Sequence, residues 1–245
     1  MRERRSLERK KYKFGQKDRL NQLSAIFNFA VKYYKLPSNP ASACGSMGKK
    51  KAESMQFWTK EEFDSFIKCV SDKPLSKVVF HLFFYSGMLE GELLTLTLND
   101  FDFDNNTVSI TKNYARLGYE EIIQAPKTPK SKRTITLSAE IMEMVKEYCS
   151  MIYDYKPTDR LFLTSKQSLT REMIRGCTAS GVKRIRIHDL RHSHASLLIE
   201  LGFAPLLISE RLGHENVETT LNTYSHLYPN KHGEVAEILS KLIQN

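Results

Sequence analysis

A short C-terminal stretch, rich in helical pattern, most constrains what this chain of 245 residues folds into and does. It carries His188-Asp189-Leu190-Arg191-His192, then Leu212-Gly213-His214, and then Tyr224. An arginine supplies a planar fork of donors for two phosphate oxygens, and a histidine donates a hydrogen bond or relays a proton near neutral pH. A tyrosine oxygen serves as a covalent nucleophile once its proton is taken. The stretch therefore holds the side chains needed to attack a phosphodiester with a tyrosine.

The histidines of this stretch have two other interpretations. His188, His192 and His194 are close enough in sequence to suggest a metal site. The usual helical zinc motif has a glutamate beside its first histidine, and Asp189 does not match it, so we predict no metal site. His188 and His192 stand four residues apart and share a helix face. For His192 and His194 we expect burial in the helix, with backbone groups as their partners.

The charge balance favours a polyanionic partner. Lysine and arginine number 37 against 28 acidic residues, which gives a formal net charge of +9 and a pI near 9.3. A basic chain of this kind favours nucleic acid as its partner, and simple solubility is the alternative explanation. No apolar run approaches the ~20 residues of a membrane span, and no apolar stretch follows the basic N-terminus as a secretory signal would. We therefore expect no membrane partner.

The four cysteines are Cys44, Cys69, Cys149 and Cys177. They are widely spaced and form no CxxC pair. The spacing argues against a structural zinc site and a disulfide framework, and a reducing cytosol fits this usage.

The pattern divides the chain into three parts. Residues 1–36 hold a basic segment and then an amphipathic helix over about 17–36. That helix has no partner in the first fifty residues, so we interpret it as the last helix of a truncated domain. Residues 37–56 are a linker rich in proline, glycine and lysine. A compact domain follows over 57–245.

Within 57–245 we predict a mainly α-helical fold with a small antiparallel β-sheet packed at one side. Thr59 and Glu62 form a capping box at the first helix, and Gly87 ends the second. The third helix begins near Glu90 and ends before Asn99. The further predicted elements are strands 101–103, 107–111, 121–124 and 133–137, and helices 138–151, 168–180, 188–201, 205–212, 216–222 and 232–243. Strands 121–124 and 133–137 are expected to pair across the basic turn between them.

Taken together, these motifs resemble those of the tyrosine recombinase family, of the phage integrase type. The C-terminal stretch carries the resemblance first, with Tyr224 ten residues after His214. Residues 86–93, Ser-Gly-Met-Leu-Glu-Gly-Glu-Leu, resemble the helix junction that holds the family's first active-site arginine. Residues 126–133 resemble the turn of its β-hairpin with the catalytic lysine, and the helix before Asn39-Pro40 resembles the end of its core-binding domain. The combined order of motifs is specific and covers nearly the whole chain.

The resemblance implies a site that cuts and rejoins DNA with no metal or cofactor. Tyr224 would attack the scissile phosphate and form a 3′-phosphotyrosine. Arg191 would clamp the non-bridging oxygens, and His214 would donate to one of them. His188 would accept or relay the tyrosine proton, and Lys127 would protonate the departing 5′ oxygen. Cationic side chains stabilise the charge of the transition state in such a site.

One upstream position departs from the family. The first active-site arginine falls at Leu89, which offers neither a donor nor a charge, and loss of one preorganised donor lowers a rate by roughly 10²–10³. Arg116, Arg133 and Lys112 are the cations we consider for its place. Glu92 matches the family's acidic residue near that arginine and would support its neighbours. The alternatives are therefore an integrase with impaired activity, an inactive DNA-binding remnant and, more remotely, a nicking topoisomerase.

Double-stranded DNA is the implied partner. The expected DNA-contacting residues are Lys127, Lys130, Lys132 and Arg133 in the basic turn and Lys49, Lys50 and Lys51 in the linker. Residues 202–213 resemble a helix-turn-helix, but we prefer core packing around the site for them. The final helix packs either on its own domain or on a neighbouring protomer, and the resemblance implies a tetramer on DNA. A cytoplasmic protein of a bacterium or phage, encoded by a mobile element, fits these features.

Overall fold

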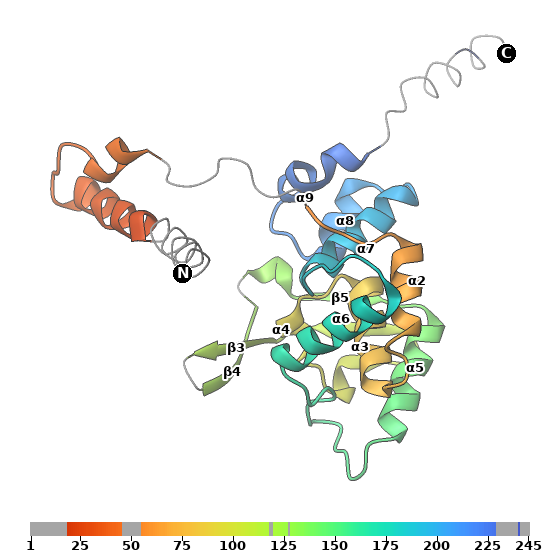
Figure 1. Cartoon of the computed structure of the whole chain (residues 1–245). Helices are drawn as coiled ribbons and strands as arrows, with labels where there is room; N and C mark the ends of the chain where they lie inside the picture. Colours follow the sequence, from red (N-terminus) through yellow and green to blue (C-terminus); the bar gives the residue numbers. More distant parts are fainter. Residues whose placement is uncertain (1–18, 46–54, 118–119, 127, 229–239, 241–245) are drawn as a thin grey trace, which may run out of the picture. The chain divides into compact units, whose positions relative to one another are not determined.

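The computed structural model describes residues 19–45, 55–117, 120–126, 128–228 and 240 (Figure 1). The chain forms two compact units, Met1–Met55 and Gln56–Asn245. The described part of the first unit contains a helix over 19–33 and the 3-10 helix η1 (Pro40–Cys44). Lys49, Lys50, Lys51, Lys127 and most of the predicted helix 232–243 lie outside the described residues.

Asn39 ties the end of the first unit back onto its helix. Its amide nitrogen lies 3.1 Å from the Ser24 carbonyl oxygen, 2.9 Å from Ser24 Oγ and 2.8 Å from Asn28 Oδ1. Its side-chain oxygen accepts a hydrogen bond of 2.9 Å from the backbone N–H of Ala41, at the start of η1. A folded segment therefore stands inside residues 37–56, for which the sequence pattern predicts a linker.

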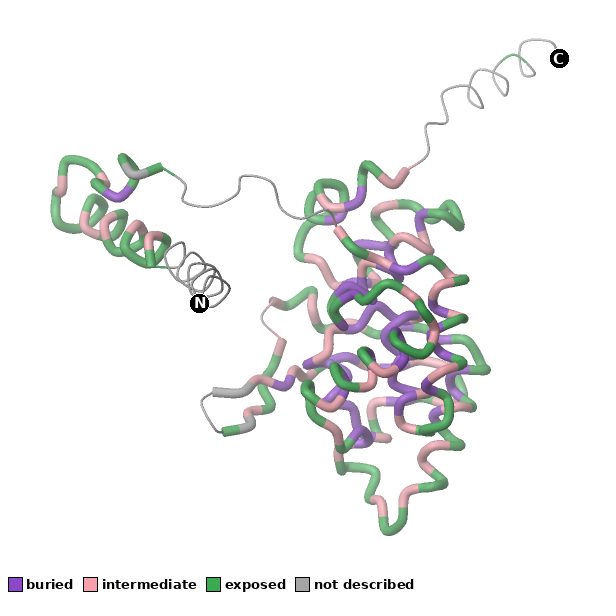
Figure 2. The backbone as a smooth tube through the Cα atoms, viewed as in Figure 1, coloured by how far each residue is buried: buried purple, intermediate pink, exposed green. Residues whose placement is uncertain are grey.

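The second unit is mainly helical, as the sequence predicts. Its α-helices are α2 (Lys60–Lys68), α3 (Pro74–Ser86), α4 (Glu90–Leu93), α5 (Ala139–Ser150), α6 (Lys166–Ser180), α7 (Asp189–Glu200), α8 (Pro205–Leu212) and α9 (Val217–Tyr224). Three 3-10 helices, η2 (Leu98–Asp100), η3 (Pro129–Ser131) and η4 (Ser225–Leu227), lie between or after them. The residues coloured as buried run through the middle of this unit in Figure 2.

Local side-chain chemistry sets the start of α2 and the end of α3. Thr59 Oγ1 accepts from the Glu62 backbone N–H at 3.3 Å, and the Glu62 carboxylate accepts from the Thr59 N–H at 2.9 Å, which confirms the predicted capping box. Gly87 ends α3 in the left-handed conformation, with φ of 65°. A β-carbon there would lie 2.7 Å from Leu212 Cδ2 and 2.8 Å from His194 Cδ2, so only glycine fits this crossing.

The third predicted helix is shorter than expected. α4 has four residues, and η2 replaces its continuation. Thr95 donates its hydroxyl to the Glu92 carbonyl oxygen at 2.8 Å, and the Asp100 carboxylate accepts from the Thr97 backbone N–H at 2.8 Å. Such local side-chain bonds compete with the helical ladder, and they end α4 early.

The strands pair differently from the prediction. β1 (Phe101–Asp102), β2 (Thr107–Ile110) and β5 (Arg133–Thr136) form an antiparallel sheet in the order β1-β2-β5. β4 (Glu120–Gln124) pairs with β3 (Asn113–Leu117) in a separate ribbon, so the predicted pairing of 121–124 with 133–137 is wrong. The sequence of β3 has no clear apolar alternation, and the prediction therefore missed it. The buried residues Val108 and Ile135 face each other in the register that holds β5 in the sheet.

Aromatic side chains fill the core between α2 and α3. The rings of Phe63 and Phe84 stack with centroids 3.9 Å apart, and Phe66 meets Phe80 edge to face at 4.9 Å. All four are buried. α3 also packs against α7, so the core supports the helix that carries the histidines and Arg191.

Candidate active site

Asp189 fixes the start of α7. Its carboxylate, 2% exposed, accepts from the Arg186 backbone N–H at 2.9 Å and from the Arg186 guanidinium at 2.7 Å. The negative charge also suits the N-terminus of a helix. The neighbouring residue His188 is solvent-exposed and stands at the N-cap. Asp189 is therefore a structural residue that presents His188 and the first turn of α7.

Arg191 joins two turns from distant parts of the chain. One terminal nitrogen donates to the Gly87 carbonyl oxygen at 2.8 Å, and the other donates to the Leu212 carbonyl oxygen at 2.6 Å. The Nε hydrogen and the second hydrogen on each terminal nitrogen have no recorded acceptor among the described residues. Burial and the charge of Arg133 lower the pKa of Arg191 to about 10, which leaves it cationic at neutral pH. A buried cation with three unused donors is a site for an anionic ligand.

Tyr224 ends α9 and contacts α7. Its hydroxyl lies 2.8 Å from His192 Nδ1. Tyr224 is 1% exposed, and burial raises its pKa to about 12 although the charge of Arg191 opposes the shift. The phenol therefore keeps its proton at neutral pH unless another group takes it.

The two inner histidines of α7 have different surroundings. The expectation of a backbone partner is confirmed for His194, whose Nδ1 donates to the Phe84 carbonyl oxygen at 2.8 Å while Nε2 accepts from Arg211 at 3.0 Å. Burial and the charge of Arg211 lower the pKa of His194 to about 3. The expectation is wrong for His192, because the packing of α9 places the Tyr224 hydroxyl against its ring.

His214 follows Gly213, whose φ of 75° ends α8 in the left-handed conformation. Its Nδ1 lies 2.8 Å from the hydroxyl of Thr220, a fully buried residue of α9. Burial and the charge of Arg191 lower the pKa of His214 to about 4, so the ring is neutral at neutral pH. Thr220 precedes Tyr224 by one helical turn. The contact between Thr220 and His214 was not predicted from the sequence.

Glu92, from α4, and Arg133, from β5, form a buried ion pair. The two carboxylate oxygens accept from the guanidinium at 2.8 Å and 2.9 Å, with side chains 3% and 6% exposed. Arg133 also donates to the Arg211 carbonyl oxygen at 2.9 Å and to the Ser131 carbonyl oxygen at 3.1 Å. Glu92 accepts in addition from the backbone N–H of Leu89 at 2.8 Å. Glu92 therefore binds both Arg133 and the backbone at Leu89, while its supporting role in catalysis stays a prediction.

Leu89 is half-buried at the N-cap of α4, two residues after the carbonyl group that Arg191 contacts. Of the cations considered for its place, Arg133 is paired with Glu92, and Lys112 Nζ lies 2.7 Å from the Asp100 carboxylate. The side chain of Arg116 lies outside the described part. Arg133 stays close enough for its charge to lower the pKa of Arg191.

The basic turn is anchored on the connection that holds His214. Lys130 Nζ donates to the Glu215 carbonyl oxygen at 2.8 Å, next to the Arg133 contact with Arg211. Lys130 and Lys132 are exposed to solvent. The segment that follows Lys127 is thus tied to the site, while Lys127 itself is not described.

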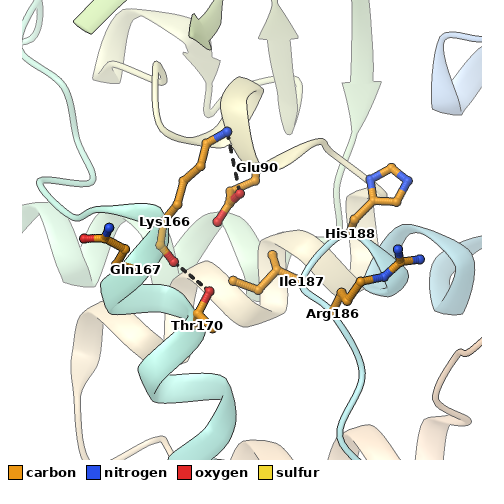
Figure 3. Close-up of a pocket in the computed structure, with 7 residues that line it drawn as sticks. All are labelled: Glu90, Lys166, Gln167, Thr170, Arg186, Ile187 and His188. Atoms are coloured by element: carbon orange, nitrogen blue, oxygen red, sulfur yellow. Dashed lines mark hydrogen bonds and ion pairs between the residues drawn. The ribbon is translucent and has the colours of Figure 1, made fainter. Parts of the chain in front are cut away.

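An open hollow of about 410 Å³ lies beside His188 (Figure 3). Its lining residues are Glu90, Lys166, Gln167, Thr170, Arg186, Ile187 and His188. Lys166 Nζ lies 3.8 Å from the Glu90 carboxylate, and burial raises the pKa of Glu90. The hollow therefore adjoins the exposed histidine and has cationic side chains on two sides.

Neither a metal cluster nor a membrane-spanning helix is present in the described part of the chain. No group of three His, Cys, Asp or Glu side chains there could hold a metal ion. None of the described helices is long and apolar enough to cross a membrane. Cys69, Cys149 and Cys177 are free thiols.

The fold is that of tyrosine recombinase catalytic domains. The integrase of the Tn1549 transposon, residues 82–397, solved in complex with circular intermediate DNA, superposes with a TM-score of 0.73 at 20% identity, over 91% of this chain and 78% of that one. The catalytic domain of bacteriophage HP1 integrase gives a TM-score of 0.54 at 22% identity, over 75% of this chain and 94% of that one.

Sequence comparison gives the family. Residues 56–231 match the phage integrase family. The chain is 31% identical over 242 residues to the ICEBs1 integrase of Bacillus subtilis (strain 168), covering 91% of this chain and 64% of that protein. It is 28% identical over 253 residues to a XerC-like tyrosine recombinase of Caldanaerobacter subterraneus subsp. tengcongensis, with the same coverage of 91% and 64%. This chain belongs to the phage integrase family of tyrosine recombinases, and it spans 64% of the length of these two relatives.

Proposed function

We propose that this chain is the DNA-cutting part of a site-specific recombinase of a phage or other mobile element, which acts in the bacterial cytoplasm. It breaks and rejoins double-stranded DNA through a 3′-phosphotyrosine on Tyr224. The observation that carries the proposal is the buried Arg191 guanidinium. Three of its donors have no acceptor among the described residues, and its charge opposes the rise in the pKa of Tyr224. A phosphodiester is the anion that this cation and this nucleophile together suit.

The surrounding groups suit the charge that develops on the phosphate. Arg191 stays cationic and donates to the non-bridging oxygens. His214 is neutral, and its Nε2 donates to a phosphate oxygen when Nδ1 accepts from the Thr220 hydroxyl. Lys127 is proposed to protonate the departing 5′ oxygen, and His188 to relay a proton at the exposed edge of the site. Preorganised donors of this kind stabilise a transition state without reorganisation.

Leu89 lowers the activity we expect. Of the cations considered for its place, Arg133 is held by Glu92 and Lys112 by Asp100. We therefore propose catalysis that is slower by roughly 10²–10³ than with an arginine at this position. The same observation favours the second candidate, a DNA-binding remnant without turnover.

Contacts with DNA and with other protomers complete the proposal. Lys130 and Lys132 are exposed on the turn beside the site and would contact DNA phosphates. Four apolar residues at the end of α7 and the start of α8 are exposed: Leu201, Phe203, Leu206 and Leu207. An exposed apolar group of this kind suits a protein contact, and we propose assembly as a tetramer on DNA, with the C-terminal helix taking part.

A nicked suicide substrate tests the function. Cleavage next to the nick releases a short strand and traps the covalent adduct, which is seen as a shift on a denaturing gel. The wild type should form the adduct slowly, Tyr224→Phe should form none, and Leu89→Arg should accelerate formation by roughly 10²–10³. If neither the wild type nor Leu89→Arg forms an adduct while both bind the DNA, the chain is the remnant. Relaxation of supercoiled plasmid without recombination would favour the topoisomerase.

A further inference from the structure

The Tyr224 hydroxyl has one recorded hydrogen-bond partner among the described residues, Nδ1 of His192, at 2.8 Å. Because Tyr224 is 1% exposed, water has little access to the phenol. A buried hydroxyl needs an acceptor for its hydrogen, and a neutral imidazole offers one lone pair. The hydroxyl therefore donates to Nδ1, and the His192 proton resides on Nε2.

The charges around His192 keep its ring neutral. The groups that face it are His188, Asp189, Arg186 and Arg191 on and before α7, His214 from the connection after α8, and Tyr224 from α9. Burial and the neighbouring His188 lower the pKa of His192, while Asp189 opposes the shift. A neutral ring at neutral pH is ready to take a proton.

We propose that His192 is a catalytic residue, which accepts the Tyr224 proton as the nucleophile attacks. The inference rests on the proposed function and adds a residue to it. In the step, the bond from Tyr224 Oη to phosphorus forms and the bond from phosphorus to the 5′ oxygen breaks. The phenol proton moves to His192 Nδ1, and the 5′ oxygen takes a proton from a separate donor, for which Lys127 is proposed. During rejoining the 5′ hydroxyl attacks phosphorus, and His192 returns its proton to the departing phenolate.

The neighbouring histidines are less suited to this role. His188 is exposed, its ring centroid lies 5.4 Å from that of His192, and no bond to Tyr224 is recorded for it in the described residues. His214 uses its Nδ1 on Thr220. The 2.8 Å contact already joins the Tyr224 hydroxyl to His192, and none joins it to His188 among the described residues.

The test measures the rate of adduct formation on the nicked substrate against pH. It compares the wild type with His192→Gln. Each is prepared with tyrosine or with 3,5-difluorotyrosine at position 224, and the phenol of the fluorinated residue ionises more readily. His226→Gln is the matched control, because His226 is an exposed histidine two residues after Tyr224. These five proteins are also prepared with Leu89→Arg, and thermal unfolding confirms that each is folded.

The proposal predicts a loss that is specific to proton transfer. His192→Gln should slow adduct formation at pH 7 by roughly 10²–10⁴, the range of general acid–base catalysis. In the wild type the rate should rise with pH in the range below about pH 6.5, where His192 loses its proton. In His192→Gln this rise with pH should be absent. Difluorotyrosine should restore most of the lost rate in His192→Gln and change the wild type much less. His226→Gln should match the wild type.

Two results would overturn the inference alone. One is a His192→Gln protein with the rate and pH profile of the wild type. The other is a slow His192→Gln protein in which the fluorinated phenol gives no more acceleration than in the wild type, since His192 would then only position Tyr224. Absence of an adduct in both the wild type and Leu89→Arg would instead overturn the proposed function, and this inference with it.

Discussion

The two sides of the candidate site use their charged groups in different ways. On the side of α7 and α9, Arg191 has donors without an acceptor among the described residues, His192 contacts Tyr224, and His214 contacts Thr220. On the side of α4 and β5, Glu92 and Arg133 satisfy each other, and Leu89 contributes no polar side chain. The first side has the donors that the proposed DNA phosphate would need, whereas the groups of the second side bind each other. The same types of side chain therefore serve chemistry or architecture according to whether their partners lie within the fold.

Arg191→Ala should have the largest effect on the first side. It removes the clamp on the phosphate, and it leaves the buried carbonyl groups of Gly87 and Leu212 without their donor. We expect adduct formation to fall by at least roughly 10³. Arg191→Lys should keep part of the binding but lose the planar fork. The control is Arg175→Ala, which disrupts a surface network with Asp72 and Glu172. Equal losses in both alanine variants would contradict the comparison.

Glu92→Gln should have the largest effect on the stability of the second side. It leaves the Arg133 guanidinium, 6% exposed, without its counter-charge. Breaking a buried pair in this way costs about 3–5 kcal/mol, measured as the free energy of unfolding in urea. Asp64→Asn breaks the exposed i,i+4 pair with Lys60 and should change that free energy by under about 0.5 kcal/mol. A similar small change for Glu92→Gln would mean that the pair does not hold the scaffold.

His194 should contribute strongly to the pH dependence of stability, alongside His214, whose pKa is also lowered. Its pKa is lowered to about 3 in the folded chain, so between this value and about 6.5 the unfolded chain binds the extra proton. Stability should therefore fall as the solution is acidified through this window, by about 2 kcal/mol between pH 7 and pH 5 from this residue. His194→Gln should weaken the dependence, measured by urea unfolding at each pH, and leave the part that comes from His214. A wild-type stability that rises on acidification would contradict this assignment.

Thr220→Val should have the smallest effect. It removes the hydroxyl that orients His214 and leaves the buried volume nearly unchanged. Loss of one neutral hydrogen bond corresponds to about a tenfold slower adduct formation. Thr220→Ser should restore the rate, and Thr219→Val at the exposed neighbouring position should leave it unchanged. If valine and serine behave alike at position 220, His214 does not need this partner.

Local chemistry made much of this molecule predictable. The capping box of Thr59 and Glu62, the helix end at Gly87 and the mainly helical fold follow from residue types at short spacing. The contact of His192 with Tyr224 joins residues 32 apart in sequence and depends on how α9 packs on α7, so no local signal gives it. The pairing of β3 with β4 is local, but the sequence of β3 has no clear apolar alternation to predict a strand. The roles of the site residues, the domain boundaries and the tetramer remain predictions.

Glu92 holds the backbone at Leu89, the position at which the proposed catalytic set lacks an arginine. The backbone N–H of Leu89 is still bound by the Glu92 carboxylate, and the two oxygens of that carboxylate are already satisfied by Arg133. An arginine at position 89 would therefore have its backbone already held, and we expect Leu89→Arg to add the cation that the proposed catalytic set lacks.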